Sequence, residues 1–288
     1  MPPNMNSPAP QSWEQAVATL LGEGKDPTLA KDCYFDGTAL QAAQRYWASE
    51  EWQALRRLLP PTAGTALDVG AGRGIASYAL ARDGWNVHAL EPDPSMLVGA
   101  GAIRQIAAET GYSIVVLEAY GEKLPFEAGR FDLIIARQAL HHARDLPALL
   151  RELYRVLRPG GRLIAVRDHV ISSHADLSRF LDVHPLHKLY GGENAYMLGE
   201  YTAAIRGAGF SLQDVIAPFD SPINYAPLTR AGLPSAIADR VPNVLHSRRF
   251  AARLLRSPPI LKAALSVIKR IDNRPGRLYS FVAERRES

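Results

Sequence analysis

Short apolar runs alternate with amphipathic stretches through the middle of the chain, and this alternation predicts strands that are followed by helices. Strands are expected at 66–69, 86–90, 113–118, 131–136, 161–166, 210–216 and 277–284. Helices are expected between several of these strands, at about 75–82 and 146–157. Strands that alternate with helices are typical of a mostly parallel sheet covered by helices. The pattern therefore predicts an α/β, Rossmann-like sheet of seven strands.

Helical patterns also precede and interrupt this sheet. The first predicts an N-terminal cap with a second helix over about 40–59. The other lies before the last strand and is far too long for a hairpin, so it is expected to be a basic helical lid with helices at 236–238, 244–255 and 260–270. The expected parts are a disordered tail, the cap, the core with an acceptor loop at 168–197, the lid and the last strand, at 1–11, 12–60, 61–220, 221–276 and 277–288.

Three glycines follow the first strand, in the run Asp68-Val69-Gly70-Ala71-Gly72-Arg73-Gly74. Glycine accepts positive φ and lets bare backbone approach a ligand. The helix that follows points its N-terminal N–H groups at the same place. A dinucleotide motif would require glycine at position 75, where this chain has isoleucine. The turn therefore predicts a nucleotide-like or carboxylate-bearing cofactor, without fixing which one.

The end of the second strand narrows this choice. Glu91 follows that strand, 17 residues after Gly74, where a carboxylate can accept hydrogen bonds from both hydroxyls of a ribose. Ser95 is a candidate helix N-cap, and Met96 is placed to pack on a flat ring. The alternative for Glu91 is an ordinary solvated strand end.

The motifs, taken together, resemble the class I S-adenosylmethionine-dependent methyltransferases. They are Asp-x-Gly-x-Gly-x-Gly at 68–74, Glu91, Glu-x-Leu-Pro-Phe at 122–126, Phe-Asp-Leu-Ile at 131–134, Leu-His-His at 140–142 and Leu-Arg-Pro-Gly-Gly at 157–161. The resemblance covers about 62–170, and more weakly 198–216 and 278–285. It looks closest to the small-molecule branch that includes ubiquinone-biosynthesis-type enzymes. It implies that the last strand is antiparallel and that the N-terminal helices close over the cofactor.

The resemblance also implies the roles of single residues. The glycines would face the methionine part of the cofactor, Glu91 the ribose and Met96 the adenine, while Arg137 would line the sulfonium end. One position departs from the family: Tyr120 replaces the aspartate that often contacts the adenine amino group. The expected cofactor-binding residues are Tyr46, Asp68, Gly70, Ala71, Gly72, Glu91, Pro92, Met96, Tyr120, Gly121, Glu122 and Arg137.

The segment after the fifth strand is dense in polar side chains and is the expected wall of the acceptor pocket. Methyl transfer needs alignment of the nucleophile, and an oxygen acceptor also needs a base for its proton. The candidate catalytic residues are His142, Asp168, His169 and His187, and the candidate acceptor-binding residues are His141, His184, Tyr190, Glu193 and Asn194. For each, a purely structural role is the alternative. No recognisable ligand spacing appears, so no metal is expected.

The residues leave the acceptor open. We expect O-methylation of a small-molecule or glycan hydroxyl, because a polar pocket suits a sugar. The alternatives are N- or C-methylation of a metabolite such as a quinone or sterol, a regulatory protein that only binds the cofactor, and nucleic-acid methylation through the basic C-terminal segment. The last conflicts with the sequence after the fourth strand, which lacks the motif typical of base-modifying enzymes, so no nucleic acid is expected.

Composition adds two further expectations. Residues 228–288 contain 13 Lys and Arg but 4 Asp and Glu, in a chain whose net charge is +4. This segment is either a lid with a solvated basic face or an interfacial helix that meets an anionic membrane or a lipid-linked acceptor. The single cysteine, Cys33, excludes an internal disulfide. The absence of a signal-like segment and of a long apolar run leads us to expect a cytoplasmic enzyme.

Overall fold

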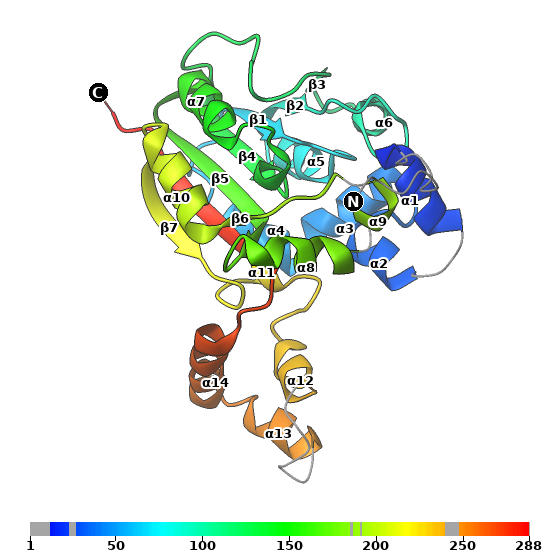
Figure 1. The fold of residues 1–288 in the computed structure, drawn as a ribbon. Helices are drawn as coiled ribbons and strands as arrows, with labels where there is room; N and C mark the ends of the chain where they lie inside the picture. The colour runs from blue at the N-terminus through cyan, green and yellow to red at the C-terminus, as the bar shows by residue number, and fades with distance from the viewer. Residues whose placement is uncertain (1–11, 23–26, 185–186, 191, 240–247, 288) are drawn as a thin grey trace, which may run out of the picture.

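A computed structural model describes residues 12–22, 27–184, 187–190, 192–239 and 248–287. A twisted sheet with helices on both faces forms the body of the protein (Figure 1). Its strands are β1 Thr65–Val69, β2 Asn86–Leu90, β3 Ile114–Leu117, β4 Phe131–Arg137, β5 Leu157–Ile171, β6 Tyr196–Met197, β7 Ser211–Ile216 and β8 Arg277–Glu284. The helices of the central repeat are α5 Ile75–Arg82, α6 Ala100–Thr110, α7 Leu146–Val156 and α10 Leu198–Gly207. The predicted α/β class is confirmed.

The strands run in the order β3-β2-β1-β4-β5-β8-β7, with β6 paired to β5 outside this path. The pairs from β3 to β5 are parallel, and β8 is antiparallel to both of its neighbours, as expected for the last strand. The sheet thus has eight strands and not seven. The additional strand has two residues, which is too short to leave a period-two pattern in the sequence.

Alternate residues of the central strands enter two separate cores. Leu133 and Ile135 of β4 pack with the layer that contains α3 (Ala39–Ala48) and α5, while Ile134 and Ala136 pack with the layer that contains α7 and α10. This alternation follows from the period of two along a strand. A sheet buried on both faces exposes only its edges and strand ends, so ligands are expected beyond the carboxyl ends of the strands.

The N-terminal cap has four helices among the described residues: α1 Trp13–Gly22, α2 Pro27–Asp32, α3 Ala39–Ala48 and α4 Glu50–Arg56. The single helix predicted over 40–59 is therefore wrong. The chain breaks at Ser49, which adopts an extended conformation (φ −74°, ψ 156°). Its hydroxyl accepts from the Trp52 N–H and so caps α4. The predicted tail at 1–11 lies outside the described residues.

The segment predicted as an acceptor loop at 168–197 is mostly regular structure. Strand β5 continues to Ile171, and the helices α8 Ala175–Val183 and α9 His187–Tyr190 follow before β6. Trp13 of α1 packs on Tyr190 of α9, with ring centroids 4.7 Å apart. The cap and the acceptor segment are therefore in contact.

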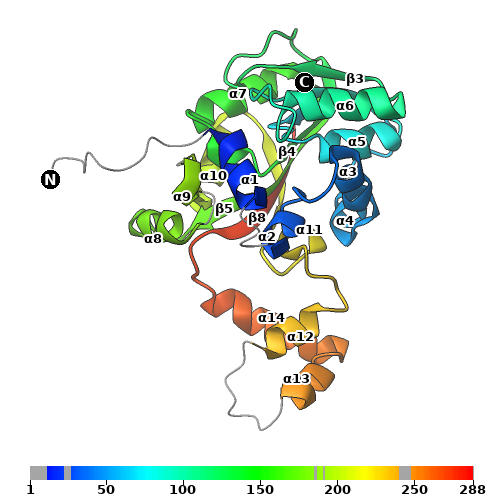
Figure 2. The same ribbon diagram turned by 90° about the vertical axis from the view of Figure 1, so that its right-hand side faces the viewer.

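The insertion contains α11 Pro222–Tyr225, α12 Leu233–Ala238, α13 Arg248–Leu254 and α14 Pro258–Ile271. Three of these correspond to the expected helices, although the start of the helix predicted from residue 244 lies outside the described residues. The last three helices project from the body as an arm (Figure 2), and they pack on one another around Leu233, Ile237 and Leu255. No helix in the described ranges is long and apolar enough to cross a membrane.

Candidate functional site

The glycine turn after β1 has the backbone conformation that its sequence predicts. Gly70, Gly72 and Gly74 have φ of 64°, 53° and 80°, a region that L side chains rarely adopt. A Cβ on Gly70 would lie 2.8 Å from the Cβ of Ala139, so this glycine lets the turn approach the segment after β4. A Cβ on Gly72 would meet only the Val98 carbonyl oxygen, at 3.8 Å, so the face of this residue is open.

Glu91 lies directly against this turn. The Gly72 N–H donates to its Oε2 at 2.7 Å, and the Asp93 N–H donates to its Oε1 at 2.9 Å. Burial raises the pKa of this carboxyl to about 7, although both backbone hydrogen bonds favour its charged form. A carboxylate oxygen accepts more than one hydrogen bond, so Glu91 keeps acceptor capacity for ligand hydroxyls.

Asp68 has a structural partner inside the protein. It is fully buried, and its Oδ2 accepts from the Ser77 hydroxyl at 2.6 Å. Burial raises its pKa to about 6, while the bond to Ser77 opposes the shift. Asp68 therefore ties the end of β1 to the first turns of α5. Its direct contact with the cofactor stays a prediction.

The residues predicted around the adenine differ in exposure. Met96 and Tyr120 are exposed, 61% and 55% respectively, which leaves their side chains accessible to a flat ligand. The Arg144 guanidinium lies over the Tyr120 ring, 4.3 Å from its centroid, and the Glu122 carboxylate accepts from the Arg144 N–H. Of the remaining predicted cofactor residues, Gly121 packs under Leu149, Ala71 is buried, and Pro92 is exposed beside Glu91.

Arg137, at the end of β4, forms a buried ion pair. It makes two hydrogen bonds to the buried Glu51 of α4, at 2.8 and 3.2 Å. Arg167 approaches the same carboxylate at 3.9 Å. Two guanidinium groups thus share one carboxylate, which leaves an excess positive charge in a buried place. Tyr46 packs against Arg137, and its buried hydroxyl has no hydrogen-bond partner among the described residues.

Three residues in or near the group formed by Arg137, Glu51 and Arg167 have a strained backbone conformation. Tyr34, Gln138 and Arg167 are the three described residues other than glycine with positive φ, at 63°, 52° and 63°. Gln138 and Arg167 follow the carboxyl ends of β4 and of the part of β5 that pairs with it, and Tyr34 lies 5.7 Å below the Arg137 guanidinium. Such conformations cost about 1–3 kcal/mol each and gather at functional sites.

These features fit the cofactor that the motifs imply. Glu91 can accept hydrogen bonds from ribose hydroxyls, and the open face of Gly72 admits a close ligand. The excess charge of Arg137 and Arg167 and the unpaired Tyr46 hydroxyl suit a carboxylate, such as that of the methionine part. The sequence did not single out Glu51, Tyr34 or Arg167 for the site. Their signal is spatial, because the cap lies far from β4 and β5 along the chain.

A second polar cluster forms beside it, between β5 and the segment 184–193. The His141 Nδ1 hydrogen bonds to the Asp168 Oδ1 at 2.9 Å, and the His141 Nε2 lies 3.6 Å from the Glu193 Oε2. Both carboxylates are buried, and Tyr190 donates to the Glu193 Oε1 at 2.9 Å. Burial opposes charge on His141, but the two carboxylates outweigh it and raise its pKa to about 9.

The other predicted acceptor-side residues lie around this cluster. His169 stacks edge-on against His141, and burial with the nearby His141 charge lowers its pKa to about 3. The exposed His142 bonds through Nδ1 to the Gly192 carbonyl oxygen at 3.1 Å. His184 lies 3.9 Å from Glu193, and its Nδ1 accepts from the His187 N–H. Asn194 is half-buried next to these residues in the chain. The structure thus brings the predicted catalytic and acceptor residues together, while their roles stay predictions.

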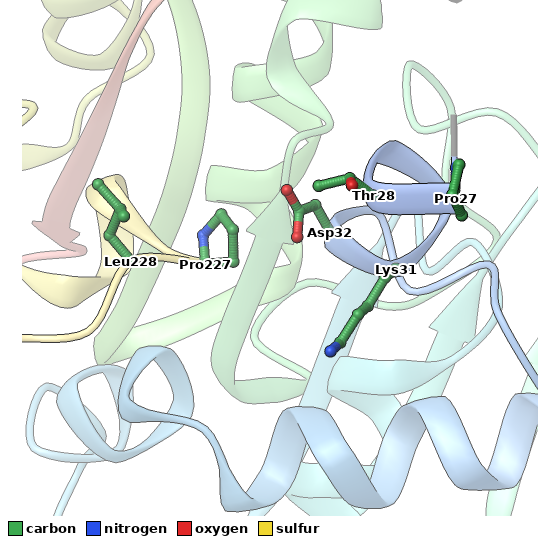
Figure 3. A pocket seen from close by; sticks show the side chains of 6 residues that line it. All are labelled: Pro27, Thr28, Lys31, Asp32, Pro227 and Leu228. Atoms are coloured by element: carbon green, nitrogen blue, oxygen red, sulfur yellow. The ribbon is translucent and has the colours of Figure 1, made fainter. Parts of the chain in front are cut away.

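The residues around the glycine turn and the cluster around His141 both lie near the carboxyl ends of the paired segments of β1, β4 and β5. Val69 of β1 pairs with Ala136 of β4, and Arg137 pairs with Val166 of β5, so the segments that follow these strands emerge side by side. A separate hollow of about 530 Å³ lies between α2 and the residues after α11 (Figure 3). Pro227 and Leu228 line one side of it, and α2 side chains line the other. None of its lining residues belongs to the predicted site.

Known proteins resemble this chain in sequence and in fold. Residues 67–165 match the methyltransferase domain family. An uncharacterized protein of Escherichia coli, YafE, is 29% identical over 182 residues, which are 63% of this chain and 79% of the relative. A ubiquinone/menaquinone biosynthesis C-methyltransferase, UbiE of Rhizobium johnstonii, is 31% identical over 57% of this chain and 62% of the relative. Several other curated relatives are matched over about half of their own length.

The fold has counterparts among solved structures. A phosphoethanolamine N-methyltransferase of Haemonchus contortus, solved in complexes with S-adenosylhomocysteine or S-adenosylmethionine, gives a TM-score of 0.58 at 17% identity for the former complex. The match covers 96% of this chain and 61% of that protein. At such low identity it shows the shared fold alone. Residues 67–165 thus match the methyltransferase domain family, and in its motifs and sheet order the chain is similar to class I S-adenosylmethionine-dependent methyltransferases.

Proposed function

We propose that this enzyme transfers a methyl group from S-adenosylmethionine to a hydroxyl of a small polar acceptor, of the glycan type. The observation that carries the proposal is the position of the polar cluster around His141, Asp168 and Glu193, on the same edge of the sheet as the glycine turn. A lining of histidines and carboxylates offers hydrogen bonds to a hydroxylated acceptor and is unfavourable for a purely apolar one.

On the donor side, the chain binds and orients the cofactor. When bound, S-adenosylmethionine supplies an activated methyl group with its own leaving group. Glu91 accepts hydrogen bonds from the ribose, and the bare backbone at Gly72 allows the close approach. Arg137 and the Tyr46 hydroxyl hold the carboxylate, with Glu51 fixing the guanidinium. Alignment of this kind supplies a large part of the rate of a transfer reaction.

On the acceptor side, His142 is the best-placed base. The Gly192 carbonyl oxygen can only accept a hydrogen bond, so the neutral His142 ring must donate from Nδ1. Its Nε2 then carries the lone pair. Because His142 is exposed, this nitrogen can take the proton of an acceptor hydroxyl. Asp168 and His169 contact His141, whose ring lies 4.1 Å from that of His142, and so act as positioning residues. His187 positions His184.

The competing acceptors make different demands. C-methylation, the activity in the printed name of the Rhizobium relative, needs an activated carbon, and an enolised or phenolic acceptor depends less on a base. O-methylation of an unactivated hydroxyl depends on one. The histidine-rich cluster therefore favours the oxygen acceptor, and we include no nucleic acid among the acceptors.

The test is methyl transfer from radiolabelled S-adenosylmethionine into a host extract separated into carbohydrate, lipid, small-molecule and nucleic-acid fractions. We expect label in the carbohydrate or polar small-molecule fraction, in a form stable to base as an ether is. His142→Gln serves as the matched control, because it keeps the cofactor site and removes the base. Label confined to the nucleic-acid fraction, or equal labelling by His142→Gln, would contradict the proposal.

A further inference from the structure

Three side chains in the acceptor-side cluster direct ligand atoms at one another. The His141 Nε2, a nitrogen of His169 and an oxygen of Glu193 all lie within 4.8 Å of one another. They come from three segments, namely the turn after β4, the body of β5 and the residues after α9. All three side chains are at most 9% exposed.

The contact between His141 and Glu193 is too long for a hydrogen bond. The His141 Nε2 and the Glu193 Oε2 are 3.6 Å apart, and this carboxylate oxygen has no hydrogen-bond partner among the described residues. A buried carboxylate oxygen without a partner is costly. Metal bonds of about 2.1 Å place neighbouring tetrahedral ligands about 3.4 Å apart, so the observed gap has the size of a ligand-to-ligand edge.

Every one of the three side chains is also fixed by a partner on its far side. The His141 Nδ1 bonds to Asp168, the His169 Nδ1 bonds to the Gly276 carbonyl oxygen at 3.1 Å, and Tyr190 donates to the other oxygen of Glu193. Since the carbonyl oxygen can only accept, His169 donates from Nδ1 and leaves its Nε2 lone pair free for the cluster. Such outer partners, a carboxylate or a carbonyl behind each histidine, are typical of metal sites.

We propose that His141, His169 and Glu193 bind one divalent transition-metal ion, and that the ion's remaining coordination position takes an oxygen of the acceptor. Two imidazoles and one carboxylate suit ions such as Zn²⁺, Fe²⁺ and Co²⁺ and are a poor set for Ca²⁺. Three protein ligands leave a position for water or substrate. The absence of ligand spacing in the sequence does not oppose this site, because the ligands come from separate segments. The part that concerns the acceptor rests on the proposed function.

The metal part is tested with Co²⁺ and Zn²⁺ on the chelator-treated full-length chain. We expect about one ion per chain, with the visible absorption of Co²⁺ in a low-symmetry site, displaced by Zn²⁺. His169→Gln and Glu193→Gln should each weaken Co²⁺ binding at least about tenfold, and Asp168→Ala, which removes an outer partner, about 10–100-fold. His174→Gln is the control, since His174 is an exposed histidine that pairs with Glu200 outside the cluster.

No binding of Co²⁺ near one equivalent, or equal affinity in the wild type and the two ligand variants, would overturn the metal site. X-ray absorption of the Zn²⁺-loaded wild type needs no variant: we expect imidazole scattering from two histidines, and a shell of oxygen atoms alone would contradict the assignment. The open position is tested by adding acetohydroxamate to the Co²⁺-loaded protein, where a changed spectrum is expected and an unchanged one overturns it. Because no acceptor is present, failure of the metal site and failure of methyl transfer are seen separately.

Discussion

The site has a donor half, around the glycine turn, Glu91 and Arg137, and an acceptor half, around His141 and Glu193. The two halves are built in different ways. The ribose side of the donor half is local and consists largely of backbone, with a glycine turn and Glu91 only 19 residues from the Gly72 N–H that donates to it, although the Arg137–Glu51 pair on the carboxylate side joins residues 86 positions apart. The acceptor half consists of side chains brought from distant segments, with His141 bonded to Asp168 27 residues away and His142 to Gly192 50 residues away. Where the backbone of one turn binds a ligand, a short sequence motif identifies the site. Where side chains from separate segments form the site, its composition changes whenever one of those segments changes.

The two halves meet at two places. Gly70 allows the turn to pack on Ala139, which directly precedes the 3-10 helix Leu140–His142, and Arg167 directly precedes Asp168 in β5. A change on one side should therefore leave the other side nearly unaffected unless it disturbs one of these connections.

Replacement of the proposed base should give the largest change. We expect His142→Gln to lower kcat by about 10²–10⁴-fold, the contribution of a general base. The affinity for S-adenosylhomocysteine should stay within about twofold, because His142 contacts the acceptor segment through Gly192. Calorimetry and a methyl-transfer assay on the same samples measure both. Equal losses in affinity and in turnover would show that the halves are not separable.

The buried ion pair between the cap and β4 should dominate stability. Glu51→Gln leaves the guanidinium groups of Arg137 and Arg167 without their carboxylate. Removing one partner of a buried pair costs about 3–5 kcal/mol, so thermal unfolding should shift to clearly lower temperature. Glu127→Gln, at an exposed position, is the control. Unchanged unfolding of Glu51→Gln would mean that the pair contributes little.

The sequence predicts the glycine turn and the position of Glu91, but neither the Glu51–Arg137 pair of the donor half nor the partners inside the acceptor half, for physical reasons. Positive φ at Gly70 and Gly72 favours glycine, and this preference is visible in the sequence itself. The bonds of His141 to Asp168 and Glu193 depend on strand order and on the path of α8 and α9, which periodicity does not fix. The sequence identifies the histidines and carboxylates of the acceptor half, but not which of them pair with one another. The helical pattern of 40–59 likewise does not show the break at Ser49, where the chain leaves the helical conformation and caps α4.

Cofactor affinity should depend on pH through Glu91. Its buried carboxyl has a pKa of about 7, above the ordinary 4.5, and the charged form is the better acceptor for ribose hydroxyls. Affinity should therefore rise about tenfold between roughly pH 6 and pH 8 and level off above. Because the folded state holds this proton more tightly than the unfolded chain, the contribution of Glu91 to the free energy of unfolding is full below pH 4.5 and is lost as pH rises through 7. Glu91→Gln should flatten both profiles, and a pH dependence that persists in this variant would assign it to another group.

The smallest effect is expected at the arm. Arg253 and Arg256 are exposed, as are the apolar side chains of Phe250 and Val267. If the arm meets an anionic surface, Arg253→Gln should reduce binding to phosphatidylserine vesicles about fivefold at low salt, the equivalent of about 1 kcal/mol for one cation. Arg130→Gln, at an exposed position in the body, is the charge-matched control. Equal binding by both variants would favour the solvated lid.

The most direct test of the separation between the halves is calorimetry of S-adenosylhomocysteine with Gly72→Val, compared with Gly84→Val. Both glycines have positive φ, and neither has a protein atom near its Cβ position other than one carbonyl oxygen at 3.8 Å for Gly72. Both variants therefore carry a similar backbone strain, but only residue 72 faces the cofactor. We predict at least about a 100-fold loss of affinity for Gly72→Val, equivalent to about 2.8 kcal/mol, and little change for Gly84→Val. An unchanged affinity in Gly72→Val, or an equal loss in both, would contradict the cofactor placement.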